Sequence, residues 1–428
     1  MSALTSPSKT PDSAVSRIQR VISPLGIEAW LIEEYAVPLI AMEFSFDGGA
    51  AQDGAEKAGL ANLLSGMFDE GAGPFSAIAF QEQLDEFAIS LRLSESKDAL
   101  GGSLKTLTRH QDKAFDLLRL ALTEPHFEAA SVDRVRAQIL GALKRSANNP
   151  NTLSSKAWSA RAFEGHAYAR PDEGVVADLE RITADDIRAL AARMITRSNL
   201  KISVVGAIDA KTLAGQLDRI FGALPATSSL MDVPLVSAAG MGEIKIIDLD
   251  IPQSTIRFGM PGLLRKDRDF IAATVMNHIL GGGSFTSRIF QEVREKRGLA
   301  YSVSTGLYPF AKAGMFFGGT ATKNERAKEA LDVIRDEIAK MASDGPTAEE
   351  LDKAKRYLVG SFALRFDTST KIANHLTMMQ VDELGIDYTE KRNGLFEAVT
   401  LEDTKRVAKR LLEPGHMLVT IAGRPTGF

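Results

Sequence analysis

ITADDIRALAARMITRSNLKISVVG, residues 182–206, has a counterpart in the second half of this 428-residue chain. It aligns without a gap on VTLEDTKRVAKRLLEPGHMLVTIAG, residues 399–423, at an offset of 217 (399 minus 182). The identical pairs are Thr183 with Thr400, Asp186 with Asp403, Ala191 with Ala408, Arg193 with Arg410, and Gly206 with Gly423. Both copies are typical of a capped helix followed by a strand.

A second pair of segments supports the repeat. VDRVRAQILGAL at 132–143 resembles LDKAKRYLVGSF at 351–362, at an offset of 219 (351 minus 132). Two matches in the same order with nearly equal offsets indicate a duplicated domain. A period this long means two copies of a domain and not a solenoid of short repeats.

The pattern of the first half predicts its fold class. Residues 27–47 read as two strands around a turn at 36–38, and further strands are expected near 88–107 and at 200–206. The expected helices lie near 56–70, 77–86, 109–124, 131–147, 152–164 and 183–195, with one more ending near 221. Because strands and helices alternate without βαβ regularity, we predict an α+β fold with helices covering a mainly antiparallel sheet.

A linker separates the two copies. PATSSLMDVPLVSAAGMGE, residues 225–243, is rich in Pro, Ser, Gly and Ala. We therefore predict a flexible tail at 1–16, homologous domains at 17–224 and 244–428, and an extended linker between them that allows a clam-shell arrangement.

Composition excludes several classes of function. The hydrophobic content of 44% and charged content of 25% are those of a globular protein, and the net charge of -4 gives no general attraction to nucleic acid or an anionic membrane. The absence of cysteine removes disulfides, thiolate catalysis and Cys-based zinc sites. With no signal-like N-terminus and no apolar run of ~20 residues, we expect a soluble, cytoplasmic protein, the periplasm not being excluded.

The stretch LGGGSFTSRIFQEVREKRGLAY, residues 280–301, carries a candidate site. Three glycines predict a flexible loop, and Ser284 and Thr286 are candidate caps of a helix whose apolar face holds Phe285, Ile289 and Val293. Gly298 is placed to end that helix, and a strand led by Tyr301 is expected to follow. Without the rest of the chain, these residues are also compatible with an ordinary turn, a charged helix face exposed to solvent and an aromatic side chain in a strand.

FDGGAAQDGAEKAGLANLLSGMFDEGAG at 46–73, with the stretch at 280–301, resembles the pitrilysin/insulinase metallopeptidases and their two-subunit bacterial and mitochondrial processing relatives. The resemblance covers nearly the whole chain. It implies a pair of homologous α+β domains, in agreement with the duplication. Active members carry an inverted zinc motif, H-x-x-E-H, in which two imidazoles share the metal and a Glu polarises water.

At the motif positions this chain reads Asn62, Leu63, Leu64, Ser65 and Gly66. Both histidine ligands and the general base at the Ser65 position are thus replaced. The third ligand of the family, a Glu, aligns with Ala142, or with Gly141 after a slip of one. No two of the six histidines are three or four residues apart. We therefore predict that this chain binds no zinc or other cofactor and is inactive alone.

In the family, an Arg and a Tyr seven residues apart reach from the C-terminal domain to the substrate at the zinc. The resemblance assigns these roles to Arg294 and Tyr301, with Arg297 as a rival for the basic role. Such donors contact the substrate carbonyl and the oxyanion formed as water attacks. The glycines Gly281, Gly282 and Gly283, with Ser284, match a loop that engages substrate in noncatalytic subunits, or simply permit a tight turn.

These inferences predict the noncatalytic subunit of a heterodimeric zinc metalloendopeptidase. Its partner would be a homologous H-x-x-E-H subunit carrying the zinc, and its substrates peptides or unfolded segments captured by strand addition. The alternatives are a catalytically silent structural protein, like the core subunits of respiratory complexes, and a homodimeric peptide-binding protein.

Overall fold

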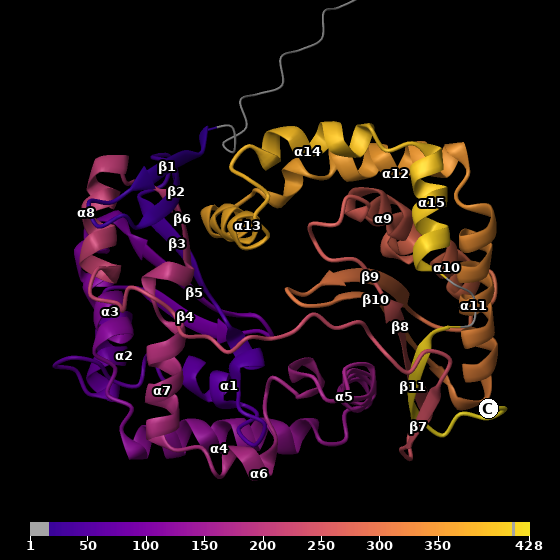
Figure 1. Cartoon of the computed structure of the whole chain (residues 1–428), viewed down its shortest axis with the longest axis horizontal. Helices are drawn as coiled ribbons and strands as arrows, with labels where there is room; N and C mark the ends of the chain where they lie inside the picture. Colours follow the sequence, from indigo (N-terminus) through magenta and orange to yellow (C-terminus); the bar gives the residue numbers. More distant parts are fainter. Residues whose placement is uncertain (1–16, 413–415) are drawn as a thin grey trace, which may run out of the picture.

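The computed structural model describes residues 17–412 and 416–428, which form two halves, each built on one sheet (Figure 1). The first sheet has the strand order β1-β2-β6-β3-β5-β4. Its strands are β1 (Gln19–Ile22), β2 (Glu28–Glu33), β3 (Leu39–Asp47), β4 (Ser90–Glu95), β5 (Ala99–Leu107) and β6 (Leu200–Gly206). The second sheet has the order β7-β11-β8-β10-β9. Its strands are β7 (Ile244–Asp248), β8 (Gln253–Pro261), β9 (Val303–Pro309), β10 (Gly314–Lys323) and β11 (Leu418–Gly423).

The two sheets have the same topology once β1 is set aside. In each, one parallel pair, β2 with β6 or β7 with β11, is followed by three antiparallel pairings. The strands at 200–206 and 418–423 occupy the same place in their sheets. The predicted α+β fold with two duplicated, mainly antiparallel domains is therefore confirmed, whereas the boundaries 17–224, 225–243 and 244–428 stay a prediction.

Most helices lie around the outside of the two sheets, whereas one helix of each half packs on the sheet of the other half (Figure 1). Those of the first half are α1 (Leu60–Ser65), α2 (Ala77–Glu86), α3 (Gln111–Thr123), α4 (Ala129–Ser146), α5 (Pro150–Ala162), α6 (Val176–Leu179), α7 (Ala184–Met194) and α8 (Ala210–Phe221). Those of the second half are α9 (Phe270–Asn277), α10 (Arg288–Phe290), α11 (Ala327–Asp344), α12 (Ala348–Gly360), α13 (Ser369–Val381), α14 (Tyr388–Glu397) and α15 (Leu401–Leu411).

One expected helix is much shorter than its pattern suggested. The helix predicted over 56–70 spans only Leu60–Ser65. Gly59, with φ +97°, precedes it, and Gly66 ends it. Since a residue with positive φ interrupts right-handed helical geometry, the helix cannot extend toward residue 56. The expected tail at 1–16 lies outside the described residues.

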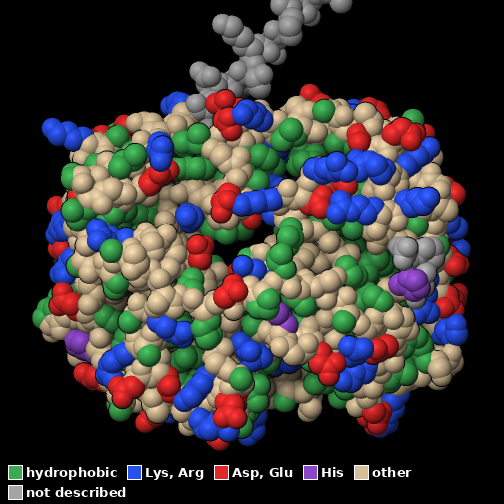
Figure 2. All heavy atoms as spheres, in the orientation of Figure 1, with side chains coloured by type: hydrophobic (Ala, Val, Ile, Leu, Met, Phe, Trp, Pro, Cys, Tyr) green, Lys and Arg blue, Asp and Glu red, His purple; other side chains and the backbone are tan. Residues whose placement is uncertain are grey.

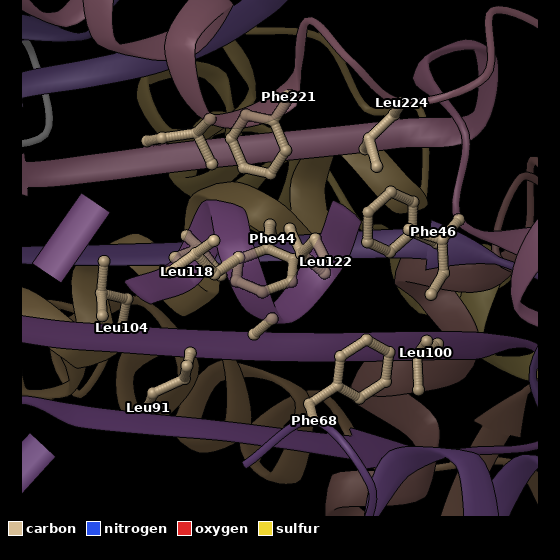
Figure 3. Packing of buried hydrophobic residues seen from close by; sticks show 14 of the residues in the cluster. Phe44, Phe46, Phe68, Leu91, Leu100, Leu104, Leu118, Leu122, Phe221 and Leu224 are labelled. Carbon is tan, nitrogen blue, oxygen red and sulfur yellow. The ribbon is translucent and has the colours of Figure 1, made fainter. Parts of the chain in front are cut away.

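The core of the first half forms on one face of its sheet. Phe44 and Phe46 of β3 pack with Phe68, Leu118 and Phe221 from the surrounding helices and loops (Figure 3). Figure 3 also labels Leu91, Leu100, Leu104, Leu122 and Leu224 in the same cluster. The alternation of β3 directs residues 40, 42, 44 and 46 into this core.

The other face of the first sheet is covered by a helix of the opposite half. α13 lies against β3 and β6, and Ile372, Ala373 and Leu376 pack on Ile32 and Val205. Thr377 donates from its hydroxyl to the Glu43 carbonyl at 3.3 Å. Gln380 donates through Nε2 to the Ile202 carbonyl and to the Ser203 hydroxyl, both at 2.8 Å. This contact explains why β3 is buried on both faces.

The arrangement is reciprocal. α5 of the first half lies against β11 and β8 of the second sheet. The Trp158 indole donates to the Leu418 carbonyl at 3.0 Å, and the Thr420 hydroxyl donates to the Ser154 carbonyl at 2.8 Å. Because α5 follows α4 as α13 follows α12, each half contributes the corresponding helix to the other's sheet.

Residues 225–243 run between the halves without helix or strand. They contact both, since the Val236 amide donates to the Lys312 carbonyl and the Ala239 amide to the Ala162 carbonyl. In the orientation of Figure 1, the space-filling surface is hollowed between the halves, near α13 and the β9–β10 hairpin (Figure 2). Among the residues described, no helix combines the length and apolar character that crossing a membrane requires.

Candidate functional site

The glycines at 281–283 form a tightly packed helix end and not a separate loop. α9 continues through a single π-helical turn, His278–Gly282, closed by a bond from the Gly283 amide to the His278 carbonyl at 2.8 Å. A Cβ on Gly281 would lie 2.3 Å from Thr305 Oγ1, and one on Gly282 would lie 2.6 Å from Asn277 Nδ2. Close packing therefore requires glycine at both positions, whether or not they also touch a substrate.

The start of the next helix differs from the prediction. Its N-cap is Ser287, not Ser284 or Thr286, and the Thr286 hydroxyl donates instead to the Gly283 carbonyl at 3.0 Å. Ser284 adopts φ +51°. This turn removes Phe285 from the helix, so its side chain is 61% exposed instead of packed with the buried Ile289 and Val293.

The helix itself is irregular and ends as expected. Residues 288–290 are α-helical, and Gln291–Glu295 form a second π-helical turn. Gly298, with φ +58°, ends it, its amide donating to the Arg294 carbonyl at 2.9 Å. β9 then begins at Val303, so Tyr301 precedes the strand it was expected to lead.

Arg294 and Tyr301 are in direct contact. The Arg294 guanidinium carbon lies 4.7 Å from the centre of the Tyr301 ring, and the rings of Phe290 and Phe285 lie at 5.1 and 5.4 Å. Its ion pair with Glu295 is a loose 3.5 Å. Aromatic rings around a guanidinium hold it without consuming its N–H donors. Arg294 therefore keeps donors available beside the 83% exposed Tyr301.

The rival basic residue is engaged elsewhere. Arg297 forms an ion pair with the Glu292 carboxylate and donates to the Glu292 carbonyl at 3.0 Å. Hydrogen bonds from Lys296 and Arg297 lower the pKa of Glu292. Geometry thus favours Arg294 over Arg297. The sequence pattern did not predict that the rings of Phe285 and Phe290 lie beside Arg294. Phe290 precedes Arg294 by four residues, and residues with this spacing are neighbours on a helix.

The residues at the zinc-motif positions do not fit a metal. Asn62 of α1 donates to the Glu173 carbonyl at 3.3 Å, and Ser65 donates to the Glu95 carboxylate at 3.0 Å. A Cβ on Gly66 would lie 2.8 Å from Val135 Cγ1, so a histidine there would collide with α4. Ala142 on α4 supplies no ligand atom. In the described part of the chain, no group of three or more His, Asp or Glu side chains could hold a metal ion.

A charged cavity of about 390 Å³ lies beside these positions. Lys97, Asp172 and Glu173 line it, and Lys97 pairs with Asp172 at 2.6 Å. Burial raises the pKa of Asp172 and of the neighbouring Glu95. Sequence patterns did not predict this cluster, because Asp172 and Glu173 lie more than 70 residues from Lys97 along the chain.

Two sequence profiles of one family match the chain. The profile described as "Insulinase (Peptidase family M16)" matches residues 37–174, and "Peptidase M16 inactive domain" matches residues 181–358. The chain belongs to the M16 family. Its relatives include the "Non-peptidase homolog YmxG" of Helicobacter pylori, 26% identical over 80% of this chain and 79% of that protein. An "Uncharacterized zinc protease" of Streptomyces coelicolor is 28% identical over 76% and 74% of the two chains.

Solved structures agree with the M16 assignment. The crystal structure of a peptidase M16 inactive domain from Pseudomonas fluorescens has a TM-score of 0.90 and 27% identity, covering 96% of this chain and 98% of that one. A protease from Helicobacter pylori has the same fold, with a TM-score of 0.86 at 17% identity over 95% and 99%. This chain is thus an M16-like protein that lacks the family's zinc motif.

Proposed function

We propose that this M16 chain is the noncatalytic subunit of a heterodimeric zinc metalloendopeptidase in the cytoplasm. The observation that carries the proposal is the contact between Arg294 and Tyr301, whose donors are left available beside the start of β9. The partner would be a homologous H-x-x-E-H subunit that holds the zinc. This chain would supply Arg294 and Tyr301 to the partner's substrate.

The chemistry suits hydrogen-bond donors that are positioned in advance. Hydrolysis of a peptide bond places negative charge on the carbonyl oxygen, and a donor aimed at that oxygen is worth about 3–4 kcal/mol in the transition state. The guanidinium of Arg294 offers up to five N–H donors and Tyr301 one O–H donor. The rings of Phe285 and Phe290 restrict the guanidinium, which reduces the ordering required on binding.

Unpaired strand edges that could bind an extended substrate lie close to Tyr301 and to the zinc-motif position Ser65. In the described residues β9 pairs with β10 alone, and β4 pairs with β5 alone. β9 begins two residues after Tyr301, and β4 ends at Glu95, the partner of Ser65. Addition of a peptide strand to either edge would satisfy its backbone and leave side chains for recognition. Gly281, Gly282, Gly283 and Ser284 remain candidate substrate contacts in this proposal.

The test is reconstitution with the zinc-bearing partner that co-purifies from the native source. Tyr301→Phe keeps the ring over Arg294 and deletes only the hydroxyl. We expect kcat to fall on the order of 100-fold with little change in KM, because the donor acts in the transition state. Tyr35→Phe is the matched control, since Tyr35 is also exposed and, within the described part of the chain, its hydroxyl bonds only Glu33. This control should retain full activity.

Arg294→Ala should be at least as damaging as Tyr301→Phe and should also raise KM, because it removes a charge as well as N–H donors. Both variants should assemble with the partner and leave its zinc content unchanged. Wild-type rates in both would reject the catalytic role.

That result would favour the second candidate, a peptide-binding protein without a part in hydrolysis, either homodimeric or bound to another structural subunit. The replacement of the family's zinc ligands by Asn62, Gly66 and Ala142 supports it equally, and the relative named a non-peptidase homolog agrees with it. Mass measurement of the native assembly distinguishes the homodimer from the heterodimer.

A further inference from the structure

A second pocket lies in the C-terminal half, away from Arg294 and Tyr301. It encloses about 200 Å³ among α9, α13 and α14 and the segment after α12. His375 and Met378 of α13 line it, together with Asp382 directly after the helix. They lie on a different side of α13 from Leu376, Thr377 and Gln380, which contact the first sheet. The pocket therefore remains open although α13 is docked.

A buried cation for which the described residues supply no counter-ion lines this pocket. Arg392 is only 6% exposed, and its guanidinium lies between the rings of Phe362 and Phe396, at 4.0 and 4.1 Å. Nη1 donates to the Leu358 carbonyl at 3.1 Å and to Asn393 Oδ1 at 3.0 Å. Among the described residues no carboxylate forms an ion pair with Arg392, and its Nε and Nη2 groups have no hydrogen-bond partner. Burial lowers the pKa of Arg392 to about 10, so it remains charged at pH 7.

Other groups of the same pocket are also suited to an anion. Nε2 of His375 is buried without a hydrogen-bond partner. Burial, with the charges of Arg392 and Arg365, lowers the pKa of His375 to about 4. Arg265 lies over the Phe270 ring and pairs with Asp382 at 3.3 Å. Three arginines against one aspartate leave an excess of positive charge in a confined space.

The unpaired positive charge of Arg392 is energetically unfavourable unless a bound group supplies a negative charge. A buried charge without a partner destabilises a fold, and stacking on aromatic rings offsets only part of that cost. An anion seated on Arg392 would supply the missing charge and accept hydrogen bonds from Nη2 and from His375 Nε2. We propose that this pocket binds a small organic anion, a carboxylate or phosphate monoester with an apolar body.

The apolar part of the ligand is inferred from the apolar side chains that line the pocket, which include Ile271 and Leu384 beside the aromatic rings. Cavities that hold drug-sized ligands occupy ≈ 300–1,000 Å³, so a pocket of about 200 Å³ admits only a smaller molecule. This site is independent of the proposed peptidase role, and neither result decides the other.

Calorimetric titration of the dialysed full-length chain tests the proposal, with benzoate, phenyl phosphate and benzamide as probes. We expect one saturable site for benzoate or phenyl phosphate, and the tighter of the two identifies the anionic group. Benzamide has the shape of benzoate without its charge and should not bind measurably. Saturation should also raise the pKa of His375 measured by NMR, because a neighbouring anion favours the imidazolium.

Two variants locate the site. Arg365→Gln removes one of the three positive charges of the pocket from an exposed side chain and should weaken anion binding roughly 10-fold. Arg392→Met keeps an apolar side chain between the two phenylalanine rings and should abolish binding. Arg356→Gln, an exposed arginine on α12 outside the pocket, is the control and should bind like the wild type.

The absence of saturable binding by both anions would overturn the proposal. So would unchanged affinity in Arg365→Gln or an unchanged pKa of His375 on saturation, and these two measurements stand even if Arg392→Met does not fold.

Discussion

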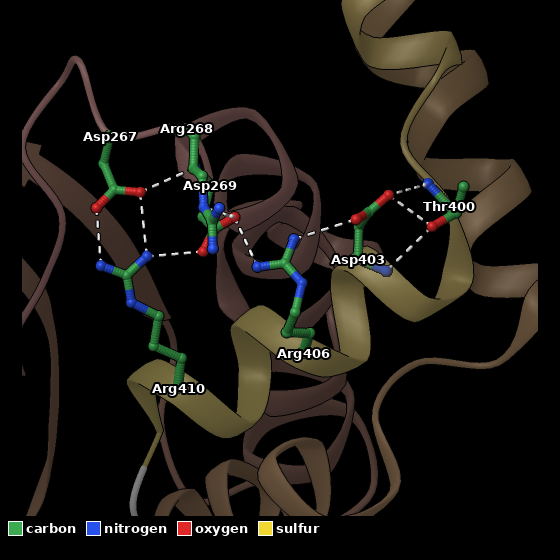
Figure 4. Close-up of polar contacts among 7 residues, drawn as sticks. All are labelled: Asp267, Arg268, Asp269, Thr400, Asp403, Arg406 and Arg410. Atoms are coloured by element: carbon green, nitrogen blue, oxygen red, sulfur yellow. Dashed lines mark hydrogen bonds and ion pairs between the residues drawn. The ribbon is translucent and has the colours of Figure 1, made fainter.

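The two halves of the molecule share a strand order but differ in how they anchor the helix that follows β3 in the first half and β8 in the second. In the first half, the buried carboxylate of Asp53 accepts backbone N–H groups of Gly59, Leu60 and Ala61 at the start of α1. In the second half, Asp269 precedes α9 and binds two arginines of α15 instead (Figure 4). Duplication preserved the frame while the anchoring interactions diverged.

The docking helices differ in the same way. α5 reaches the second sheet through a buried indole, whereas α13 reaches the first sheet through an aliphatic row and the Gln380 amide. Both sheets need a helix from the other half to cover one face. The two copies therefore retain the same topology, but they do not retain the side chains that make this contact.

Removing the indole of α5 should give the largest effect on stability. Trp158→Ala leaves a cavity between α5 and β11 and an unpaired Leu418 carbonyl, so we expect the free energy of unfolding to fall by about 4 kcal/mol. Urea denaturation measures it. Trp158→Phe, which restores ring volume without the N–H, should recover part of the loss. A change below about 1 kcal/mol in the alanine variant would mean that α5 does not hold the halves together.

The equivalent substitution in the docking helix of the second half is Leu376→Ala in α13. Leu376 is fully buried against the first sheet, and the substitution should cost about 3 kcal/mol. If the halves depend on each other, both variants should unfold in one transition monitored by tryptophan fluorescence and circular dichroism alike. Separate transitions for the two probes would show that the halves fold independently.

Asp269→Asn tests the anchor that only the second half possesses. The side chain of Asp269 is 3% exposed and accepts from Arg406 and Arg410, both at 2.7 Å. Because both arginines are about half exposed, screening limits the expected loss to about 2 kcal/mol at pH 7. Arg268, at 4.0 Å and largely exposed, should contribute little, so Arg268→Gln is the control.

The same anchor predicts a pH dependence. Burial alone would raise the pKa of Asp269, but the bonds from Arg406 and Arg410 outweigh it and leave the pKa below its ordinary value. A depressed pKa in the folded state stabilises the protein above the unfolded pKa of about 4, and this stability is lost as the pH falls through the folded value. Between pH 7 and pH 3 the wild type should therefore lose more stability than Asp269→Asn. Parallel curves would contradict the assignment.

The smallest effects should come from the repeated capping boxes. The Asp186 amide donates to the Thr183 hydroxyl at 3.2 Å, and the Asp403 amide donates to the Thr400 hydroxyl at 3.1 Å. Thr183→Ala and Thr400→Ala should each cost about 1 kcal/mol. Equal losses in thermal or urea unfolding would strengthen the equivalence of the halves. A much larger loss in one would show that its cap has acquired a further role.

Sequence patterns predicted what depends on short-range periodicity. Thr183, Asp186, Thr400 and Asp403 identified two capped helices, and the structure contains both capping boxes. The prediction of two strands around a turn in residues 27–47 is confirmed by β2 and β3. The pattern failed at 284–286, where Phe285 has helical spacing but the positive φ of Ser284 and the cap at Ser287 put it outside the helix. A backbone turn of this kind leaves hydrophobic spacing unchanged.

By itself the sequence determined the duplication, the α+β class, the family resemblance and the loss of zinc ligands at Asn62, Gly66 and Ala142, because residue identity and local periodicity encode these features. Only the tertiary structure decided that α5 and α13 cross to the opposite sheets, that Arg294 lies against Tyr301, and that Arg392 is buried with no counter-ion among the residues described. Those properties arise between residues from separate elements, and the distance, burial and screening that govern their energies exist only after the chain has packed.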